Sequence, residues 1–498
     1  MVVVSKGVAT GEHEPLLTST NGQPFSPPDY DNRRHEQVAG PSTQRSGVSP
    51  VNREFDDEEP PPAYERANLK RRPPVLRRFF AALAVAVLVY LLGLAYVASA
   101  WDLRPVTPPK APLAPTGPTQ EDGKVVQHFF ASKPDSGWTV QFEKIGRFEQ
   151  RANLQLNLYM SEADVSLGSF LVTRGSTAKG TVIYQMIPVQ TSNRWLAFNI
   201  TVDSNRASDF AFTSAAILER TTNSEVGVGI YLPDGDADMS VVVQVQIPVL
   251  ARDQNETLVR SFRARTHDFM HNFLLDDRVI MDILDIHATG SGAIFSQAAF
   301  STTQITMQTY LGAISGELSA NLRADLRTVS GPIVAKTSLG KTLPHGRAIV
   351  PSLSMITVSG LVEGSIQLFN SPTFSVFART VSASILIPVS VLPLNATLTF
   401  DARSERGDVQ MVVPPTFEGS IELTTQSGVV GLSIPNHLSD PAGLDRKIRT
   451  TEDENGSDRL WRGSVWWDDG TQHRGSGKVL LQSTYGSCQL VMRKDGSG

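Results

Sequence analysis

Histidine pairs and clustered carboxylates are the first residues to consider for chemistry in this sequence. His267 and His271 stand four residues apart in HDFMH, and on a helix the two side chains would share a face and could bind a metal. No third ligand at a suitable spacing is evident, so we interpret them as surface or turn histidines. DGDAD, Asp234 to Asp238, places three carboxylates at alternate positions. Met239 and Val245 occupy the places where an EF-hand loop requires Gly and Glu, so we predict a solvated turn.

Motifs of the common catalytic sites are absent from the sequence. It contains no HExxH, no GxSxG and no GxxxxGK[ST]. The formal net charge of −5 gives no general basic field of the kind that nucleic-acid-binding proteins carry. We therefore expect no enzymatic activity, no catalytic residue, no cofactor, no metal and no nucleic-acid partner. An enzyme acting on wall polysaccharide is an alternative, and it would need two carboxyl groups about 5 to 10 Å apart.

One aromatic pair could contact sugars. Trp466 and Trp467 precede Asp468 and Asp469, and aromatic rings stack on the apolar faces of sugars. The same residues fit a strand in which one tryptophan is buried and the other lies in a groove. We favour that second interpretation.

The N-terminal segment carries the pattern Pro-Pro-x-Tyr twice. Its residues are Pro27, Pro28, Tyr30, Pro61, Pro62 and Tyr64. Adjacent prolines favour a polyproline II turn, which docks in the aromatic groove of a WW domain at low entropic cost. The pattern resembles the motif that recruits WW-domain ubiquitin ligases of the HECT type, and two copies on one chain would permit bivalent binding. Segment 1–74 has few large aliphatic residues, so we predict a disordered tail.

A third short motif lies closer to the N-terminus. Glu12, Leu16 and Leu17 in EHEPLL fit the pattern [DE]xxxL[LI]. This resembles the signal by which clathrin-type adaptors route membrane proteins to endosomes, lysosomes or vacuoles. The leucines would enter an apolar pocket of the adaptor while the acid meets a basic patch.

An apolar segment after the tail determines which side of a membrane these motifs occupy. Residues 79–100 carry no charge, and as a helix they would be about 33 Å long, which matches a bilayer core. Basic residues concentrate on the N-terminal side, at Arg66, Lys70, Arg71, Arg72, Arg77 and Arg78. Cationic flanks stay cytosolic, so we predict a single-pass signal-anchor helix over 75–101 with a cytosolic N-terminus. The membrane would be the plasma membrane or that of an endosome or vacuole.

The remaining chain is predicted to be a stalk followed by an all-β domain. Proline-rich residues 102–123 favour a stiff spacer, and 124–493 contains β-branched runs bounded by turn residues. A repeat is clearest over 286–492: an apolar residue, any residue, Thr or Ser (Ala in the first copy), two residues, then Gly. The glycines Gly292, Gly312 and Gly331 are 20 and 19 residues apart. This spacing predicts stacked rungs of a β-solenoid, with a two-sheet sandwich as the alternative.

These Gly-centred rungs resemble the putative-adhesin class of β-solenoid domains of unknown function. VVPPTFEGSIELTTQSGVVGLS, Val412 to Ser433, followed later by LWRGSVWWDDG and GKVLLQSTYGSCQLVM, is similar to a fungal form of that class. A Pro-rich cytosolic tail and one membrane span also occur in those proteins. The resemblance covers about residues 286–492 and implies a non-enzymatic surface or lumenal domain.

Modification sites and the single cysteine fit a location outside the cytosol. Four N-glycosylation sequons, at Asn199, Asn255, Asn395 and Asn455, all follow the predicted span. Cys488 has no second cysteine in the chain to pair with, and we expect a buried free thiol.

Together these features predict a non-enzymatic, single-pass membrane glycoprotein. Its tail would bind a ubiquitin ligase and an adaptor, either as cargo or to bring the ligase to other membrane proteins. Its β domain would contact a ligand, a cell wall or a partner. A cell-surface adhesin is the second interpretation.

Overall fold

A computed structural model describes part of the chain. The described residues are 118–119, 121–131, 139–145, 149–160, 168–175, 178–189, 196–205, 210, 212–220, 224–234, 239–250, 256–341, 350–435, 438–452, 459–468 and 475–493. The predicted tail with its WW and adaptor motifs, the predicted span, most of the stalk, Asn255 and Asn455 lie outside these ranges. Within them, no helix is long and apolar enough to cross a membrane.

The described part of the chain is built from β-strands, so the all-β prediction is confirmed. The strands are β1 (Lys124–Phe130), β2 (Thr139–Ile145), β3 (Glu149–Met160), β4 (Ser169–Arg174), β5 (Ala178–Val189), β6 (Leu196–Ser204), β7 (Ser214–Arg220), β8 (Glu225–Tyr231), β9 (Met239–Leu250), β10 (Thr257–His267), β11 (Phe269–Leu274), β12 (Val279–Thr289), β13 (Ile294–Ser296), β14 (Ser301–Thr309), β15 (Ile314–Thr328), β16 (Ile333–Leu339), β17 (Ser352–Ile356), β18 (Val362–Leu368), β19 (Thr373–Arg379), β20 (Ile385–Val391), β21 (Thr397–Ser404), β22 (Val409–Val413), β23 (Gly419–Thr425), β24 (Val430–Ser433), β25 (Lys447–Glu452), β26 (Leu460–Asp468), β27 (Gly477–Ser483) and β28 (Cys488–Met492).

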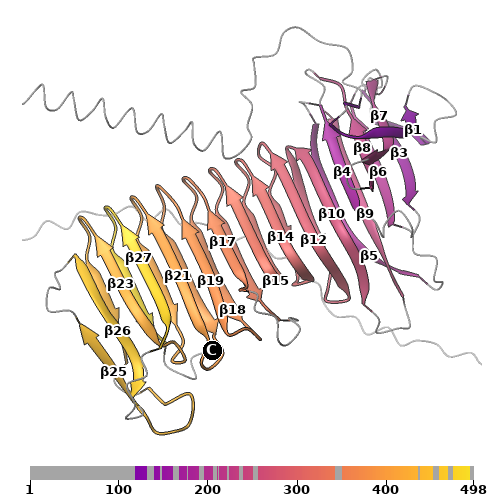
Figure 1. Ribbon diagram of the computed structural model, residues 1–498. Helices are drawn as coiled ribbons and strands as arrows, with labels where there is room; N and C mark the ends of the chain where they lie inside the picture. Colours follow the sequence, from indigo (N-terminus) through magenta and orange to yellow (C-terminus); the bar gives the residue numbers. More distant parts are fainter. Residues whose placement is uncertain are drawn as a thin grey trace, which may run out of the picture. The chain divides into compact units, whose positions relative to one another are not determined.

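From β10 to β22, most strands pair in parallel with the next strand but one. Examples are β10 with β12, β12 with β14, β16 with β18, and β19 with β21. The long strand β15 belongs to two runs, since its first half pairs with β13 and β16 and its second half with β14 and β17. Two stacks result, and each rung of the chain gives one strand to each (Figure 1).

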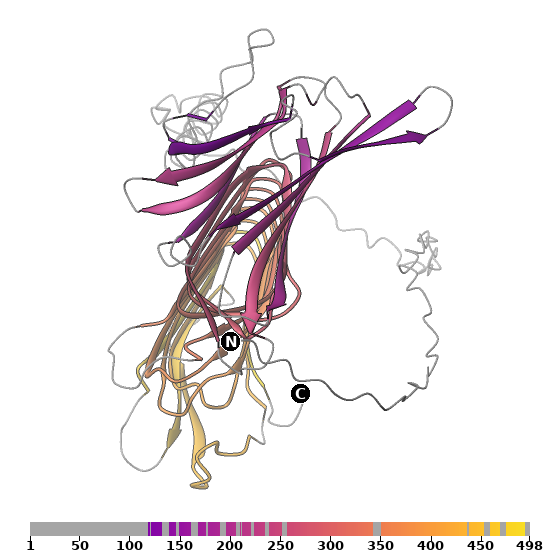
Figure 2. The same cartoon turned by 90° about the vertical axis from the view of Figure 1, so that its right-hand side faces the viewer.

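We name the stacks by their members. Stack A runs β8, β4, β10, β12, β14, β15, β17, β19, β21, β27 and β23, and stack B runs β9, β5, β11, β13, β15, β16, β18, β20, β22, β28 and β24. Figure 2 looks nearly along the stacks and shows their strands as two facing layers. A sandwich of antiparallel sheets was the alternative. Among the strands that the structure describes, antiparallel pairing occurs only at the ends, in β1–β7–β8, β2–β3–β6–β9 and β23–β26–β25.

Rungs are out of sequence order at both ends of the stacks. Strands β27 and β28 lie between β21–β22 and β23–β24, as Figure 1 shows for β27. In the same way, β4 and β5 lie between β8–β9 and β10–β11. At each end, one pair of strands is therefore inserted between two rungs that are not its neighbours in the sequence.

The space between the stacks holds the core. Side chains alternate along each strand, so β16 buries Ile333, Ala335, Thr337 and Leu339 and exposes the residues between them. Apolar side chains from both stacks form one continuous cluster. Each rung buries its apolar side chains against those of its neighbours, so no rung completes its core alone.

The Thr or Ser and the Gly of the predicted repeat lie at the corner that joins the two strands of a rung. The Thr328 hydroxyl accepts a hydrogen bond from the Gly331 amide at 3.0 Å and donates to the Gly312 carbonyl of the previous rung at 3.2 Å. Thr357 repeats this arrangement one rung further, with the Gly360 amide at 2.9 Å and the Gly331 carbonyl at 3.3 Å. A ladder of hydroxyls thus satisfies the corner backbone groups.

The corner glycines are required by the close approach of successive rungs. A Cβ on Gly331 would overlap the carbonyl oxygen of Gly312, and a Cβ on Gly312 would overlap that of Gly292. The first copy of the repeat differs by one extra residue, Gly290 at φ +94°, which lies in the left-handed region.

Candidate functional site

A hollow in the described surface lies on the outward face of stack B. It has a volume of about 570 Å³ and crosses five neighbouring strands, β13, β15, β16, β18 and β20. We call it the stack B groove. Its lining residues are Phe295, Ser315, Gly316, Glu317, Val334, Ala335, Lys336, Glu363, Gly364, Ser365, Leu386 and Pro388.

The lining of the groove is largely apolar. Phe295 and Val334 are 39% and 40% exposed, which is high for such side chains on a sheet surface. Leu386 and Pro388 contribute from β20 and are half-buried. Exposed large apolar side chains gathered over one hollow indicate a binding surface more strongly than the same residues scattered singly.

A row of small residues lines part of the groove. Gly316, Ala335 and Gly364 are aligned in register on three successive strands. Gly316 has φ +114°, and a Cβ on Gly316 or Gly364 would overlap the backbone of the preceding rung. The strands therefore approach closely in this row.

The charges of the groove are one ammonium group and two carboxylates. Lys336 Nζ and Glu317 Oε1 form an ion pair at 3.1 Å. Glu363 is exposed, and no described residue makes a hydrogen bond or ion pair with its carboxylate. The groove therefore presents one uncompensated negative charge beside apolar side chains.

A smaller and more polar hollow lies over β23, β25, β26 and β27. Its volume is about 240 Å³, and Ser420, Glu422, Arg462, Ser464 and Lys478 are among its lining residues. The Arg462 guanidinium donates to Glu422 Oε1 at 2.9 Å, so the two charges largely satisfy each other.

The histidines of HDFMH are not on a helix and differ in environment. His267 ends β10 and is partly exposed, whereas His271 lies in β11 and is fully buried, which contradicts its interpretation as a surface or turn residue. His271 Nδ1 lies 2.9 Å from the Tyr184 hydroxyl and Nε2 lies 2.8 Å from the Thr266 hydroxyl. Burial lowers the pKa of His271 to about 3. Within the described ranges, no three His, Cys, Asp or Glu side chains are grouped so as to hold a metal ion.

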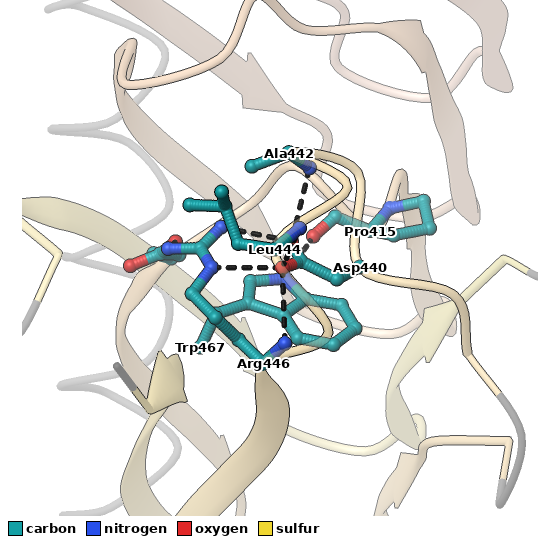
Figure 3. A network of polar contacts seen from close by, with 7 residues as sticks. Pro415, Asp440, Ala442, Leu444, Arg446 and Trp467 are labelled. Atoms are coloured by element: carbon teal, nitrogen blue, oxygen red, sulfur yellow. Dashed lines mark hydrogen bonds and ion pairs between the residues drawn. The ribbon is translucent and has the colours of Figure 1, made fainter. Parts of the chain in front are cut away.

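The tryptophan pair follows the favoured interpretation. Trp467 is buried and its Nε1 donates to the Pro415 carbonyl at 2.7 Å, whereas Trp466 is half-buried. Beside Trp467, the Asp440 carboxylate accepts hydrogen bonds from the Arg446 guanidinium and from three backbone amides (Figure 3). The Arg446 guanidinium, together with those amides, holds the pKa of Asp440 well below its usual range. These hydrogen bonds hold the loop before β25 in place, and they engage both oxygens of the Asp440 carboxylate.

Two sequons and the cysteine can be placed. Asn395 is exposed in a turn at φ +61°, whereas Asn199 is half-buried in β6, where its Nδ2 donates to Gln244 Oε1 at 3.4 Å. Cys488 is a buried free thiol, as expected, and burial raises its pKa to about 11. The Cys488 thiol donates to the Thr424 carbonyl, so it is a packing group with little thiolate character.

Comparison with known proteins adds little to this geometry. No protein-family model matches the chain, and no curated protein matches it. One solved structure similar to it is described as a putative cell adhesion protein from Clostridium sporogenes, with 7% identity, a TM-score of 0.16, and coverage of 68% of this chain and 99% of that one. Another is described as a putative adhesin from Bacteroides fragilis, with 10% identity, a TM-score of 0.27, and coverage of 68% and 96%. At these TM-scores neither likeness carries an argument.

Sequence reasoning missed the groove entirely. Each of its strands contributes only one to three residues, and strands adjacent in space are up to about thirty residues apart in the chain. The available signal was apolar residues such as Phe295 and Val334 at outward positions of alternating strands. That signal becomes visible only once the register of neighbouring rungs is known.

Proposed function

We propose that this protein is a non-enzymatic, membrane-tethered recognition protein whose β unit, a two-sided β-solenoid, binds a polypeptide segment in the stack B groove. The observation that carries the proposal is the groove itself. It combines exposed apolar side chains with one unpaired carboxylate, Glu363. Apolar surface supplies affinity, and the charge selects among ligands.

The dimensions of the groove define the ligand. Five neighbouring strands about 4.8 Å apart span about 19 Å, which is the length of roughly six residues of extended peptide. Phe295 and Val334 offer contacts for apolar side chains of that segment, and Glu363 favours an adjacent Lys or Arg. The proposed occupant is therefore a short extended segment with apolar side chains and a cation.

Catalysis is the weaker interpretation of the same residues. Glu317 and Glu363 are the two carboxylates that an enzyme acting on wall polysaccharide would have to use. The Glu317 carboxylate already forms an ion pair with Lys336, and both are well exposed. Neither carboxylate is the buried acid that glycoside hydrolysis uses as its proton donor.

The rest of the proposal comes from the sequence. A single span over 75–101 would place the β unit outside the cytosol, with sugars on its sequons, at the plasma membrane, an endosome or a vacuole. The cytosolic tail would bind a WW-domain ubiquitin ligase through Tyr30 and Tyr64, and a clathrin-type adaptor through Leu16 and Leu17. Adhesion to a surface is one form that recognition by the β unit could take.

Binding of a labelled peptide tests the groove. The full chain in detergent micelles should bind a short peptide of apolar residues and arginine, and Val334→Asp should weaken binding at least tenfold, because a carboxylate replaces an apolar contact. Val429→Asp is the matched control, since Val429 is also exposed but lies outside the groove. Equal binding by the wild type and Val334→Asp would overturn the assignment of the groove.

Capture from cytosol tests the tail. The full chain should retain a WW-domain ligase, and the double variant Tyr30→Ala plus Tyr64→Ala should lose it, because the tyrosines fill pockets beside the polyproline groove. Retention of the same ligase by both chains would show that the repeated motif is not a docking site.

A further inference from the structure

The outward face of stack A carries a row of basic residues, none of which lines the stack B groove. Register links one residue from each strand of stack A between β10 and β23: Arg265, His287, Gln308, Arg327, Ile356, Arg379, Arg403, Gln482 and Thr424. We call this set the basic row. It contains four arginines and a histidine and no carboxylate, although the chain as a whole has a net charge of −5.

The spacing within the row is regular because the strands are. Neighbouring strands lie about 4.8 Å apart, so Arg327 and Arg379, two strands apart, are separated by about 10 Å along the stack. Arg379 and Arg403 are on adjacent strands, as are Arg265 and His287. From Arg265 to Arg403, a linear ligand lying across the strands would meet an arginine or a histidine at every first or second rung.

Three members of the row are held in place by a carboxylate two residues earlier on the same strand. Asp325 lies 2.7 Å from Arg327, and Asp401 lies 2.8 Å from Arg403. Asp285 lies 2.8 Å from His287 in the same arrangement. These pairs fix the direction of the side chains and neutralise part of their charge.

Two members lack that compensation. The residue two positions before Arg379 is Phe377, and the residue two positions before Arg265 is Arg263. Both Arg265 and Arg379 are exposed, and neither makes a hydrogen bond or ion pair in the described part of the chain. Their guanidinium groups are available to a ligand.

Positive charge is most concentrated where the row reaches β10. Arg220 and Arg263 share the buried Glu225 carboxylate, at 3.6 and 3.4 Å, and the Arg220 guanidinium lies 4.0 Å above the Phe170 ring. Burial, and then the charge of nearby Arg265, lower the pKa of Arg220. Two further carboxylates act on this cluster: Asp285, the register partner of Arg263, and Asp122, whose charge acts on Arg220. Asp285 is already bound to His287 and Asp122 to Arg174.

We propose that the basic row binds an acidic polysaccharide whose sulfate or carboxylate groups lie along the stack. Exposed guanidinium groups recognise both kinds of oxyanion in a two-pronged geometry. A single-stranded nucleic acid is disfavoured, because such ligands need aromatic platforms for their bases. In the basic row and in the row of residues two positions earlier, Phe377 is the only aromatic residue besides the imidazole of His287. This surface is separate from the stack B groove and does not depend on its assignment.

Binding of a fluorescein-labelled heparin oligosaccharide tests the proposal. We expect the full chain in detergent micelles to bind it, with affinity that falls as salt is raised from about 50 to 200 mM. The double variant Arg265→Gln plus Arg379→Gln should weaken binding about tenfold or more and reduce the salt dependence. Arg278→Gln, which changes an exposed arginine outside the row, should leave binding unchanged.

Further binding measurements distinguish the basic row from other causes of heparin binding. Val334→Asp should leave heparin binding intact, so failure of the groove would not mimic failure of the row. A neutral oligosaccharide of the same length that binds as tightly as the heparin oligosaccharide would overturn the proposal, and so would a DNA oligomer that binds more tightly. Equal losses in Arg278→Gln and the double variant would also overturn it, since the effect would then come from general charge.

Discussion

His271 illustrates how single residues are set by their surroundings in this protein. Its ring is fully buried against Tyr184, and its two nitrogens face hydroxyl groups that can each either donate or accept. No carboxylate is bound to it, so the folded protein holds it neutral. Sequence alone suggested a surface or turn residue. The chain turns from β10 into β11 at Asp268, which has φ +50°, and no glycine or proline marks this corner in the sequence.

Acid should destabilise the protein through this residue. The pKa of His271 is about 3 in the folded state and about 6.5 in an unfolded chain, so the unfolded state binds an extra proton between these values. The stabilisation is complete above about pH 6.5 and is lost as the pH falls toward 3. The free energy of unfolding should fall by on the order of 1 kcal/mol per pH unit from this group.

Urea denaturation at a series of pH values between 7 and 4 checks this. His271→Gln cannot take up the proton, so its unfolding free energy should vary less steeply with pH than that of the wild type. Parallel curves for wild type and His271→Gln would show that the buried ring does not titrate in this way.

At the scale of elements, the corners determine the spacing of the rungs. A threonine or serine hydroxyl bridges two successive corners, and glycine lets the backbones approach. These residues were visible in the sequence as a repeat of about 20 residues, because the same steric and hydrogen-bonding requirement recurs at every rung. The position of β27 and β28 was not visible, since strands with the same alternating pattern are interchangeable until their neighbours are known.

Glycine substitutions test the corner directly. Gly331→Ala places a Cβ on the Gly312 carbonyl oxygen, so we expect a loss of about 2 to 4 kcal/mol in the free energy of unfolding. Gly431→Ala, in β24, meets no atom within 4 Å and should change it by less than about 0.5 kcal/mol. Chemical denaturation of the two variants compares them, and similar midpoints would contradict the proposed role of the corner.

At the scale of the whole molecule, the two stacks offer different outward faces. Stack B has an apolar groove with an unpaired carboxylate, and stack A has a basic row. Both surfaces are assembled from residues on several rungs, so neither is a motif in the linear sequence. The all-β class, the burial of Cys488 and the burial of one tryptophan of the pair were predictable from residue type and pattern, because burial of apolar and aromatic side chains is a local preference.

The central claim is that the stack B groove recognises a segment with apolar side chains and a cation. The most direct measurement compares the affinities of two labelled peptides that differ only in carrying arginine or glutamate, for the full chain and for Glu363→Lys. We predict that the wild type prefers the arginine peptide and that Glu363→Lys reverses the preference, because the unpaired charge of the groove changes sign. An unchanged preference in Glu363→Lys would contradict the claim.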